Sequence, residues 1–245
     1  MEGSRRIGIK TADGICPATV IAPEGAGNAA IILYMDAFGP RPALETMARR
    51  FASQGYGVLL PDLFYRFGDY GPFDAKTAFT DPDTGPRLRG MIGETTQALT
   101  IADTADFLRA LAENGFDGKV GAVGYCMGGA RALNAAAHYP DRIVAAASIH
   151  GGNLASEGED SPHRHAGRIK GRVYVGAAGV DRSFPPEQAA LLAEALRTAE
   201  VDHILENYVG MAHGWAVPDH SVYDEREAER HWERLGVFFA ETLNG

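Results

Sequence analysis

Long apolar runs, paired cysteines and an excess of positive charge are all missing from this 245-residue chain. No window approaches the roughly 18 consecutive apolar residues that suggest a membrane-spanning helix, so we expect no membrane partner. The first ten residues, MEGSRRIGIK, carry basic side chains but lack the apolar core of a secretory signal. The formal net charge is −9. Such a balance argues against a nucleic-acid partner, because that function calls for a basic surface.

The scarcity of cysteine restricts the setting further. The chain has two, Cys16 and Cys126, in different sequence contexts. Without an export signal, two thiols favour a reducing cytoplasm and no disulfide framework. The composition, 45% hydrophobic and 22% charged, is typical of a soluble globular protein. We expect residues 1–245 to form one domain, present as a monomer or homodimer.

Strand-like and helix-like segments alternate along the chain. The apolar run 29–35 is typical of a strand buried on both faces, and the helices expected near 41–54 and 94–114 each carry an apolar stripe. This order predicts an α/β fold with a mainly parallel central sheet and helices on both faces. Residues 6–22 are expected to form an antiparallel hairpin. Further strands are expected at 56–62, 119–123, 143–149, 172–177 and 203–208, and further helices at 126–138, 186–200 and 222–243.

Two long segments interrupt this alternation. Residues 66–93 are rich in Gly, Pro and Asp, and residues 151–168 are polar. Long loops inside compact domains are functional or disordered. Both segments lie beside strand ends, where α/β proteins place their sites, so we expect them to act as pocket walls or lids.

The sequence GYCMGG at 124–129 follows the apolar run at 120–123. A sharp strand-to-helix turn lifts its central residue above the sheet and requires small neighbours, which the glycines supply. The start of the following helix lowers the pKa of a thiol placed there and offers backbone N–H groups to an oxyanion. Cys126 is therefore a candidate nucleophile, although a buried structural thiol would fit the same motif.

Two later residues favour the nucleophile interpretation. Asp181 follows an apolar strand and a glycine turn, and His213 lies in a glycine-flanked loop after the strand expected at 203–208. Nucleophile, acid and histidine then occur in the order found in α/β-hydrolases. His163 and His165 do not have the spacing of a metal site. We expect neither a metal nor an organic cofactor, because a triad and backbone donors suffice for such chemistry.

These residues resemble the dienelactone hydrolase family of α/β-hydrolases over about residues 15–243. The resemblance rests on GYCMGG, the Asp181 loop with its two prolines, AHGW at 212–215, PDL at 61–63 and DAFGP at 36–40. It implies a Cys–His–Asp triad that opens small esters or lactones through an acyl-enzyme. Cys126 would attack the carbonyl, His213 would act as base and then acid, and Asp181 would orient the imidazole. The oxyanion hole would be the backbone N–H groups of Met127 and Ala37.

The same resemblance assigns binding or supporting roles to Asp36, Phe38, Tyr125 and Trp215. Two departures from the family pattern affect the substrate. Asp36 replaces a glutamate, and the arginine that shortly follows the catalytic histidine and holds a substrate carboxylate is missing from HGWAV. Three other arginines are candidates to replace it: Arg87, Arg89 and Arg182.

Two alternatives remain open at this stage. Class I glutaminases also place cysteine on a GxCxG turn, but they normally follow the histidine with x-Glu, whereas His213 is followed by Gly214 and Trp215. A thiol sensor or binding protein on the same fold would also use an accessible thiol, without turnover. Hydrolysis of an activated ester, abolished in Cys126→Ala, distinguishes the enzyme from the sensor.

Overall fold

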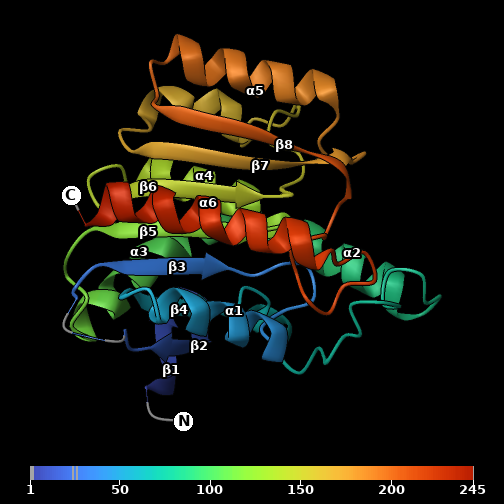
Figure 1. Ribbon diagram of the computed structural model, residues 1–245. Helices are drawn as coiled ribbons and strands as arrows, with labels where there is room; N and C mark the ends of the chain where they lie inside the picture. The colour runs from blue at the N-terminus through green and yellow to red at the C-terminus, as the bar shows by residue number, and fades with distance from the viewer. Residues whose placement is uncertain (1–2, 24, 26, 245) are drawn as a thin grey trace.

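The computed structural model describes residues 3–23, 25 and 27–244. An eight-stranded sheet in the order β1-β2-β4-β3-β5-β6-β7-β8 forms its centre (Figure 1). The first two strands form an antiparallel hairpin, and β2 also pairs antiparallel with β4. The remaining pairs are parallel. The strands are β1 (Ser4–Thr11), β2 (Gly14–Ile21), β3 (Ala30–Tyr34), β4 (Gly57–Pro61), β5 (Val120–Tyr125), β6 (Ile143–Ile149), β7 (Arg172–Val180) and β8 (His203–Ala212).

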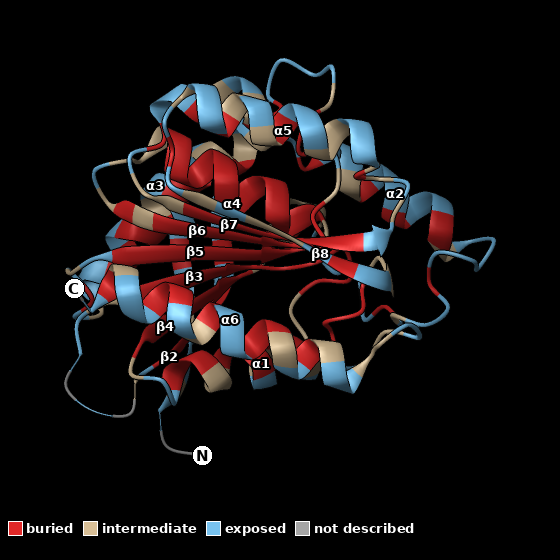
Figure 2. Ribbon diagram, turned by 45° about the horizontal axis from the view of Figure 1, so that its top comes forward, coloured by how far each residue is buried: buried red, intermediate tan, exposed pale blue. Residues whose placement is uncertain are grey.

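Helices cover both faces of the sheet (Figure 2). One face carries α1 and α6, and the other carries α3, α4 and α5. The helices are α1 (Pro42–Ala52), α2 (Thr84–Glu94), α3 (Gln97–Glu113), α4 (Met127–His138), α5 (Pro186–Thr198) and α6 (Glu225–Leu243), with 3₁₀ turns at Tyr65–Phe67 and Pro162–Arg168. The α/β-hydrolase fold predicted from the sequence is confirmed.

Burial explains why the sequences of the central strands are continuous apolar runs. Every residue of β3, β4 and β5 is buried, because helices cover both sides of these strands. The helix α4 is buried along its length except for His138, and its alanines and glycines allow it to pack closely on the sheet. The core thus holds the carboxyl ends of β5 to β8 in fixed relation, and the candidate residues follow these ends.

The structure corrects several of the predicted boundaries. Part of the segment 66–93, predicted to be irregular, is the helix α2, and the helix predicted over 94–114 begins only after a break at Thr95 and Thr96. The Thr96 hydroxyl accepts a hydrogen bond from the Leu99 N–H at 3.2 Å and caps α3. The strands β7 and β8 also run longer than predicted, so Asp181 and His213 each directly follow a strand.

None of the helices in the described part of the chain is both long enough and apolar enough to cross a membrane.

Candidate active site

Cys126 occupies a strained turn between β5 and α4. Its backbone has φ 55° and ψ −120°, a positive φ that is uncommon for a residue with a side chain. Its N–H donates to the Ile149 carbonyl at 3.1 Å, which ties the turn to the end of β6. The side chain is partly exposed. Such strain at the end of a strand is typical of a nucleophile turn.

The glycines around Cys126 are required by close backbone contacts. A Cβ atom on Gly124 would lie 1.9 Å from the Gly128 carbonyl oxygen, and one on Gly128 would lie 2.3 Å from the Tyr34 carbonyl oxygen. Neither position can hold a larger residue without displacing backbone. The glycines predicted to make room for the turn therefore do so by letting α4 approach both β5 and β3.

Asp181 and His213 form a close pair beside this turn. The imidazole Nδ1 lies 2.7 Å from Asp181 Oδ2. The other carboxylate oxygen accepts from the Ser183 N–H at 2.8 Å and from the Ser183 hydroxyl at 2.6 Å. With both oxygens engaged, the carboxylate is held in one orientation, and it fixes the orientation of the His213 ring in turn.

The electrostatics of the pair favour a charged imidazole. Burial lowers the pKa of His213, but the negative charge of Cys126 and hydrogen bonding to Asp181 and Cys126 outweigh burial and raise that pKa to about 10. Burial raises the pKa of Asp181, but its hydrogen bond to His213 and the charge of that ring outweigh this, so the pKa is lowered overall. A thiolate, an imidazolium and a carboxylate in series are the charge state that a cysteine nucleophile needs.

Two backbone N–H groups are free near the turn. Within residues 3–23, 25 and 27–244, no acceptor is found for the N–H of Ala37 or of Met127. Met127 begins α4, and Ala37 follows β3, the strand next to β5. The neighbouring Phe38 N–H is already bonded to Asp36 Oδ1 at 3.0 Å, so it is not available as a donor. Both N–H groups expected to form an oxyanion hole are therefore without an acceptor in the part of the chain that the structure describes.

A cavity of about 680 Å³ opens over Cys126. Phe79 and Ile92 from the segment 66–93 and Gly152 and Asn153 from the segment 151–168 contribute to its lining. Both segments therefore form walls of the cavity. Cys126, Met127, Asp181 and His213 line the same space.

Arginine positions differ from those expected. Arg182 lines the cavity, whereas Arg87 and Arg89 bond to the carbonyls of Asp69 and Phe79 and do not. The sequence analysis missed Arg131, on α4, which also lines the cavity and is only 6% exposed. Its guanidinium donates to the carbonyls of Met127 and Thr95, its Nε has no partner, and no carboxylate in the described chain pairs with it. Burial lowers its pKa to about 10, so it remains a cation at neutral pH.

Asp36 is fully buried and does not contact Cys126. Its carboxylate accepts from both terminal nitrogens of Arg41, at 2.7 and 2.8 Å, and lies 3.0 Å from His220 Nε2. Burial raises its pKa, but the hydrogen bonds of His220 and Arg41 outweigh burial and lower it overall. Arg41 also bonds to Asp219, at 2.6 and 2.8 Å. Asp36 therefore supports the loop after β3. These partners could not be recognised from the sequence, because Asp219 and His220 lie far along the chain.

The other residues predicted to bind substrate, Phe38, Tyr125 and Trp215, pack against other side chains and not against the cavity. Phe38 packs edge-on against Phe79, at 5.2 Å between ring centroids, and against His220 at the same distance. Tyr125 is buried with its hydroxyl 3.1 Å from His231 Nε2, and Trp215 is buried against Tyr208. None of the three lines the cavity over Cys126.

His150 is a further residue missed by sequence reasoning. It follows β6 directly and is completely buried, and its Nδ1 lies 3.1 Å from the backbone nitrogen of Cys126. The signal that could have found it is a histidine followed by Gly151 and Gly152 at the end of a predicted strand.

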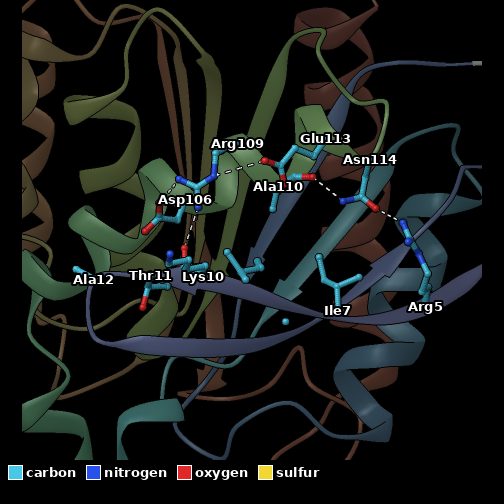
Figure 3. Close-up of a pocket in the computed structure, with 12 residues that line it drawn as sticks. Arg5, Ile7, Lys10, Thr11, Ala12, Asp106, Arg109, Ala110, Glu113 and Asn114 are labelled. Atoms are coloured by element: carbon cyan, nitrogen blue, oxygen red, sulfur yellow. Dashed lines mark hydrogen bonds and ion pairs between the residues drawn. The ribbon is translucent and has the colours of Figure 1, made fainter.

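A second cavity, of about 850 Å³, lies between β1 and α3 (Figure 3). Arg109 pairs there with Asp106 and Glu113, and Arg5 bonds to Asn114. The residues that line this cavity include no cysteine, serine or histidine. No cluster of three or more His, Cys, Asp or Glu side chains suited to a metal ion occurs in residues 3–23, 25 and 27–244.

A cysteine on the turn after β5, with an Asp–His pair after β7 and β8 of a mainly parallel sheet, defines an α/β-hydrolase. The model of the dienelactone hydrolase family matches residues 16–243, so the chain belongs to that family and is a hydrolase of its type.

Individual relatives agree with this placement. A Salmonella typhi protein named provisionally as a carboxymethylenebutenolidase is 26% identical over 231 residues, covering 92% of this chain and 82% of that protein. A Klebsiella pneumoniae structure, named provisionally as a dienelactone hydrolase, superposes with a TM-score of 0.84 at 24% identity, covering 97% of this chain and 98% of that one. The dienelactone hydrolase-like promiscuous phosphotriesterase P91, from metagenomic libraries, gives a TM-score of 0.78 at 24% identity, covering 98% and 99%. At these identities the two structures show the fold alone.

Proposed function

We propose that this protein hydrolyses small carboxylic esters or lactones through a thioester formed on Cys126. The observation that carries the proposal is the 2.7 Å pair of His213 and Asp181 beside a strained, partly exposed cysteine in one cavity. A structural thiol would need neither the strained turn nor a charged imidazole. Cys16 illustrates the contrast, because it is fully buried and burial raises its pKa well above the usual range.

The reaction follows from these positions. The Cys126 thiolate attacks the substrate carbonyl, and the oxygen that gains the negative charge binds the N–H groups of Met127 and Ala37. When the carbon–oxygen bond breaks, the imidazolium of His213 gives its proton to the leaving alkoxide. His213 then takes a proton from water, whose oxygen attacks the thioester carbonyl. Collapse of this second intermediate releases the acid and returns the thiolate and imidazolium.

The cavity lining indicates the kind of acyl group. Its volume of about 680 Å³ suits a small substrate. Arg131 places a buried cation without a carboxylate partner at the wall, and Arg182 adds an exposed one. A buried cation without an ion-pair partner is costly, and a substrate carboxylate would add to the favourable interactions that Arg131 has with the charges of Cys126 and Asp160. We therefore place the acidic group of the substrate toward Arg131.

A substrate panel tests both parts of the proposal. Matched esters and lactones, with and without a carboxylate, are assayed with the wild type and with Cys126→Ala. We expect Cys126→Ala to lose about 10³-fold or more in kcat, as the loss of a nucleophile in a coupled triad does. Near-normal hydrolysis by this variant would refute the cysteine mechanism. Equal kcat/KM for charged and neutral substrates would refute the role given to Arg131.

The same panel decides between the enzyme and a thiol sensor. Both cysteines are free, and the burial of Cys16 makes it a poor partner for an exposed sensor thiol. A sensor would bind or become oxidised at Cys126 without turning over any member of the panel.

A further inference from the structure

His150 lies directly behind the nucleophile and contacts it through the backbone. The residue ends β6 with a positive φ of 39°, and its own N–H donates to the Gly176 carbonyl at 2.8 Å, on the neighbouring strand β7. Its side chain is 0% exposed. A residue with a side chain adopts this conformation only where its surroundings hold it there. Those surroundings include the amide of Cys126.

The hydrogen bond to that amide fixes the protonation of the ring. The Cys126 N–H is a donor, so His150 Nδ1, 3.1 Å away, accepts and carries no proton. The ring proton is then on Nε2, which has no partner in the described chain. The same Cys126 N–H is shared with the Ile149 carbonyl, also at 3.1 Å. If Nδ1 were protonated, its N–H would face the Cys126 N–H, and neither group could accept the hydrogen bond.

The rings around His150 also require it to be neutral. His213 and Trp215 each lie 5.1 Å away between ring centroids, Tyr125 lies 5.8 Å away and His220 lies 6.4 Å away. Burial, and next the positive charge of His213, hold the pKa of His150 well below its usual range. Two carboxylates in this region, Asp181 and Asp36, are bonded to His213 and His220 and not to His150. In the proposed reaction His213 is thus the histidine that changes charge, and the neighbouring His150 stays neutral.

We propose that His150 is a positioning residue of the hydrolase reaction: as a neutral acceptor for the Cys126 N–H, it holds the nucleophile turn in its strained geometry. The next amide along the turn is that of Met127, the proposed oxyanion donor, so a rotation at Cys126 moves both the thiolate and this N–H. A misplacement of about 1 Å in an active site costs up to about 10²-fold in rate. This inference rests on the cysteine mechanism proposed above.

Two variants of similar polarity separate the roles of the two ring nitrogens. In His150→Asn the side-chain oxygen can occupy the place of Nδ1 and accept from Cys126. In His150→Gln the amide extends toward the place of Nε2 and leaves the Cys126 N–H to Ile149 alone. We expect His150→Asn to keep kcat within about threefold of the wild type and His150→Gln to lose about 10- to 100-fold, with KM nearly unchanged.

The pH dependence distinguishes positioning from proton transfer. Since His150 stays neutral, the acid limb of kcat/KM in His150→Asn should coincide with that of the wild type. Equal, large losses in both variants, or a lost limb in His150→Asn, would show that the imidazole itself moves a proton and would overturn the proposal. Equal, near-normal kcat in both variants would overturn it as well.

A matched control and a second readout separate other causes. His231 is also fully buried, but its ring bonds to the Tyr125 hydroxyl and the Ala228 carbonyl, and neither ring nitrogen bonds to the Cys126 backbone. His231→Asn should lower the melting temperature and leave kcat unchanged, which shows that losing a buried histidine does not by itself slow the reaction. Alkylation of Cys126 by iodoacetamide reports nucleophile geometry without hydrolysis. It should slow about tenfold in His150→Gln and not in His150→Asn. Full activity in Cys126→Ala would instead refute the cysteine mechanism, whatever the His150 variants do.

Discussion

Each polar side chain around Cys126 is bonded to only a few partners, and these partners determine which part of the site it supports. Asp181 bonds to Ser183 and His213, so its carboxylate serves the imidazole. Asp36 bonds to Arg41 and His220, so it is not available to the thiol. Asp36, which replaces the glutamate of the family pattern, thus belongs to the ion-pair network of Arg41 and His220. The Cys126 thiolate depends on His213 as its oppositely charged partner.

Asp181→Asn tests this dependence. The amide cannot compensate the charge of the imidazolium, so the pKa of His213 should fall from its raised value of about 10. The imidazolium would then lose its proton at a lower pH, which ends the thiolate–imidazolium pair earlier as the pH rises. The basic limb of kcat/KM should therefore move to lower pH. We expect kcat to fall about 10²-fold or more at neutral pH, as the loss of a triad carboxylate does in related geometries. A pH profile and kcat identical to those of the wild type would show that Asp181 does not orient His213.

The sequence was sufficient to predict the site residues that stand in a motif after a strand. It was not sufficient for residues that reach the site through contacts with segments far along the chain. Cys126, Asp181 and His213 stood out because glycines and strand ends mark their positions. Arg131 looks like any polar residue on a helix, and only the packing of α4 against Thr95 brings it to the cavity. His150 became a candidate only when β5 and β6 were seen side by side.

At the scale of elements, the site depends on how closely α4 approaches β3 and β5. The helix can do so because Gly124 and Gly128 leave backbone against backbone. The predicted elements were correct where apolar periodicity was strong. Prediction failed at α2, because Gly85, Pro86, Gly90 and Gly93 weaken a helical pattern that packing of Leu88 and Met91 nevertheless stabilises.

Gly128→Ala is expected to weaken this helix–strand contact. The new methyl group would lie 2.3 Å from the Tyr34 carbonyl oxygen and 2.6 Å from that of Met35, so α4 must shift. We expect the free energy of unfolding to fall by about 1–3 kcal/mol, measured by urea denaturation, with a loss of kcat because the nucleophile turn moves with the helix. Gly90→Ala is the matched control in the exposed part of α2, where the nearest atom to the new methyl is 4.0 Å away. It should raise stability by about 0.5–1 kcal/mol. If Gly128→Ala left the free energy of unfolding unchanged or raised it, as expected for the control, the contact would not be restrictive.

For the molecule as a whole, the alternation of strands and helices was enough to predict the sheet, because a parallel sheet covered on both faces leaves few arrangements of consecutive elements. The same architecture places polar groups in its interior. His150 and His231, whose rings both lie close to that of Tyr125, are fully buried. The residues around them in the sequence do not reveal this burial, so the effect of pH on stability could not be predicted from the sequence.

These two histidines should make the fold sensitive to mild acid. Burial lowers the pKa of His231 to about 3, and burial with neighbouring positive charge lowers that of His150 well below its usual range. The unfolded chain takes up these protons near pH 6.5, whereas the folded chain does not. Their contribution to stability is therefore fully present above about pH 6.5 and is lost as the pH falls toward the folded-state values. Between pH 6.5 and 5, before most carboxylates titrate, the free energy of unfolding should fall by up to about 2.7 kcal/mol per pH unit, which corresponds to two protons.

Denaturation curves at a series of pH values measure this slope directly. His231→Asn removes one of the two buried imidazoles, so its stability should fall with about half the wild-type slope over the same interval. A mutation of a partly exposed histidine, such as His203→Asn at the start of β8, leaves both buried imidazoles in place and should leave the slope unchanged. Stability that does not change between pH 6.5 and 5 in the wild type would mean that both rings are already protonated in the fold, which would also contradict the acceptor role given to His150 Nδ1.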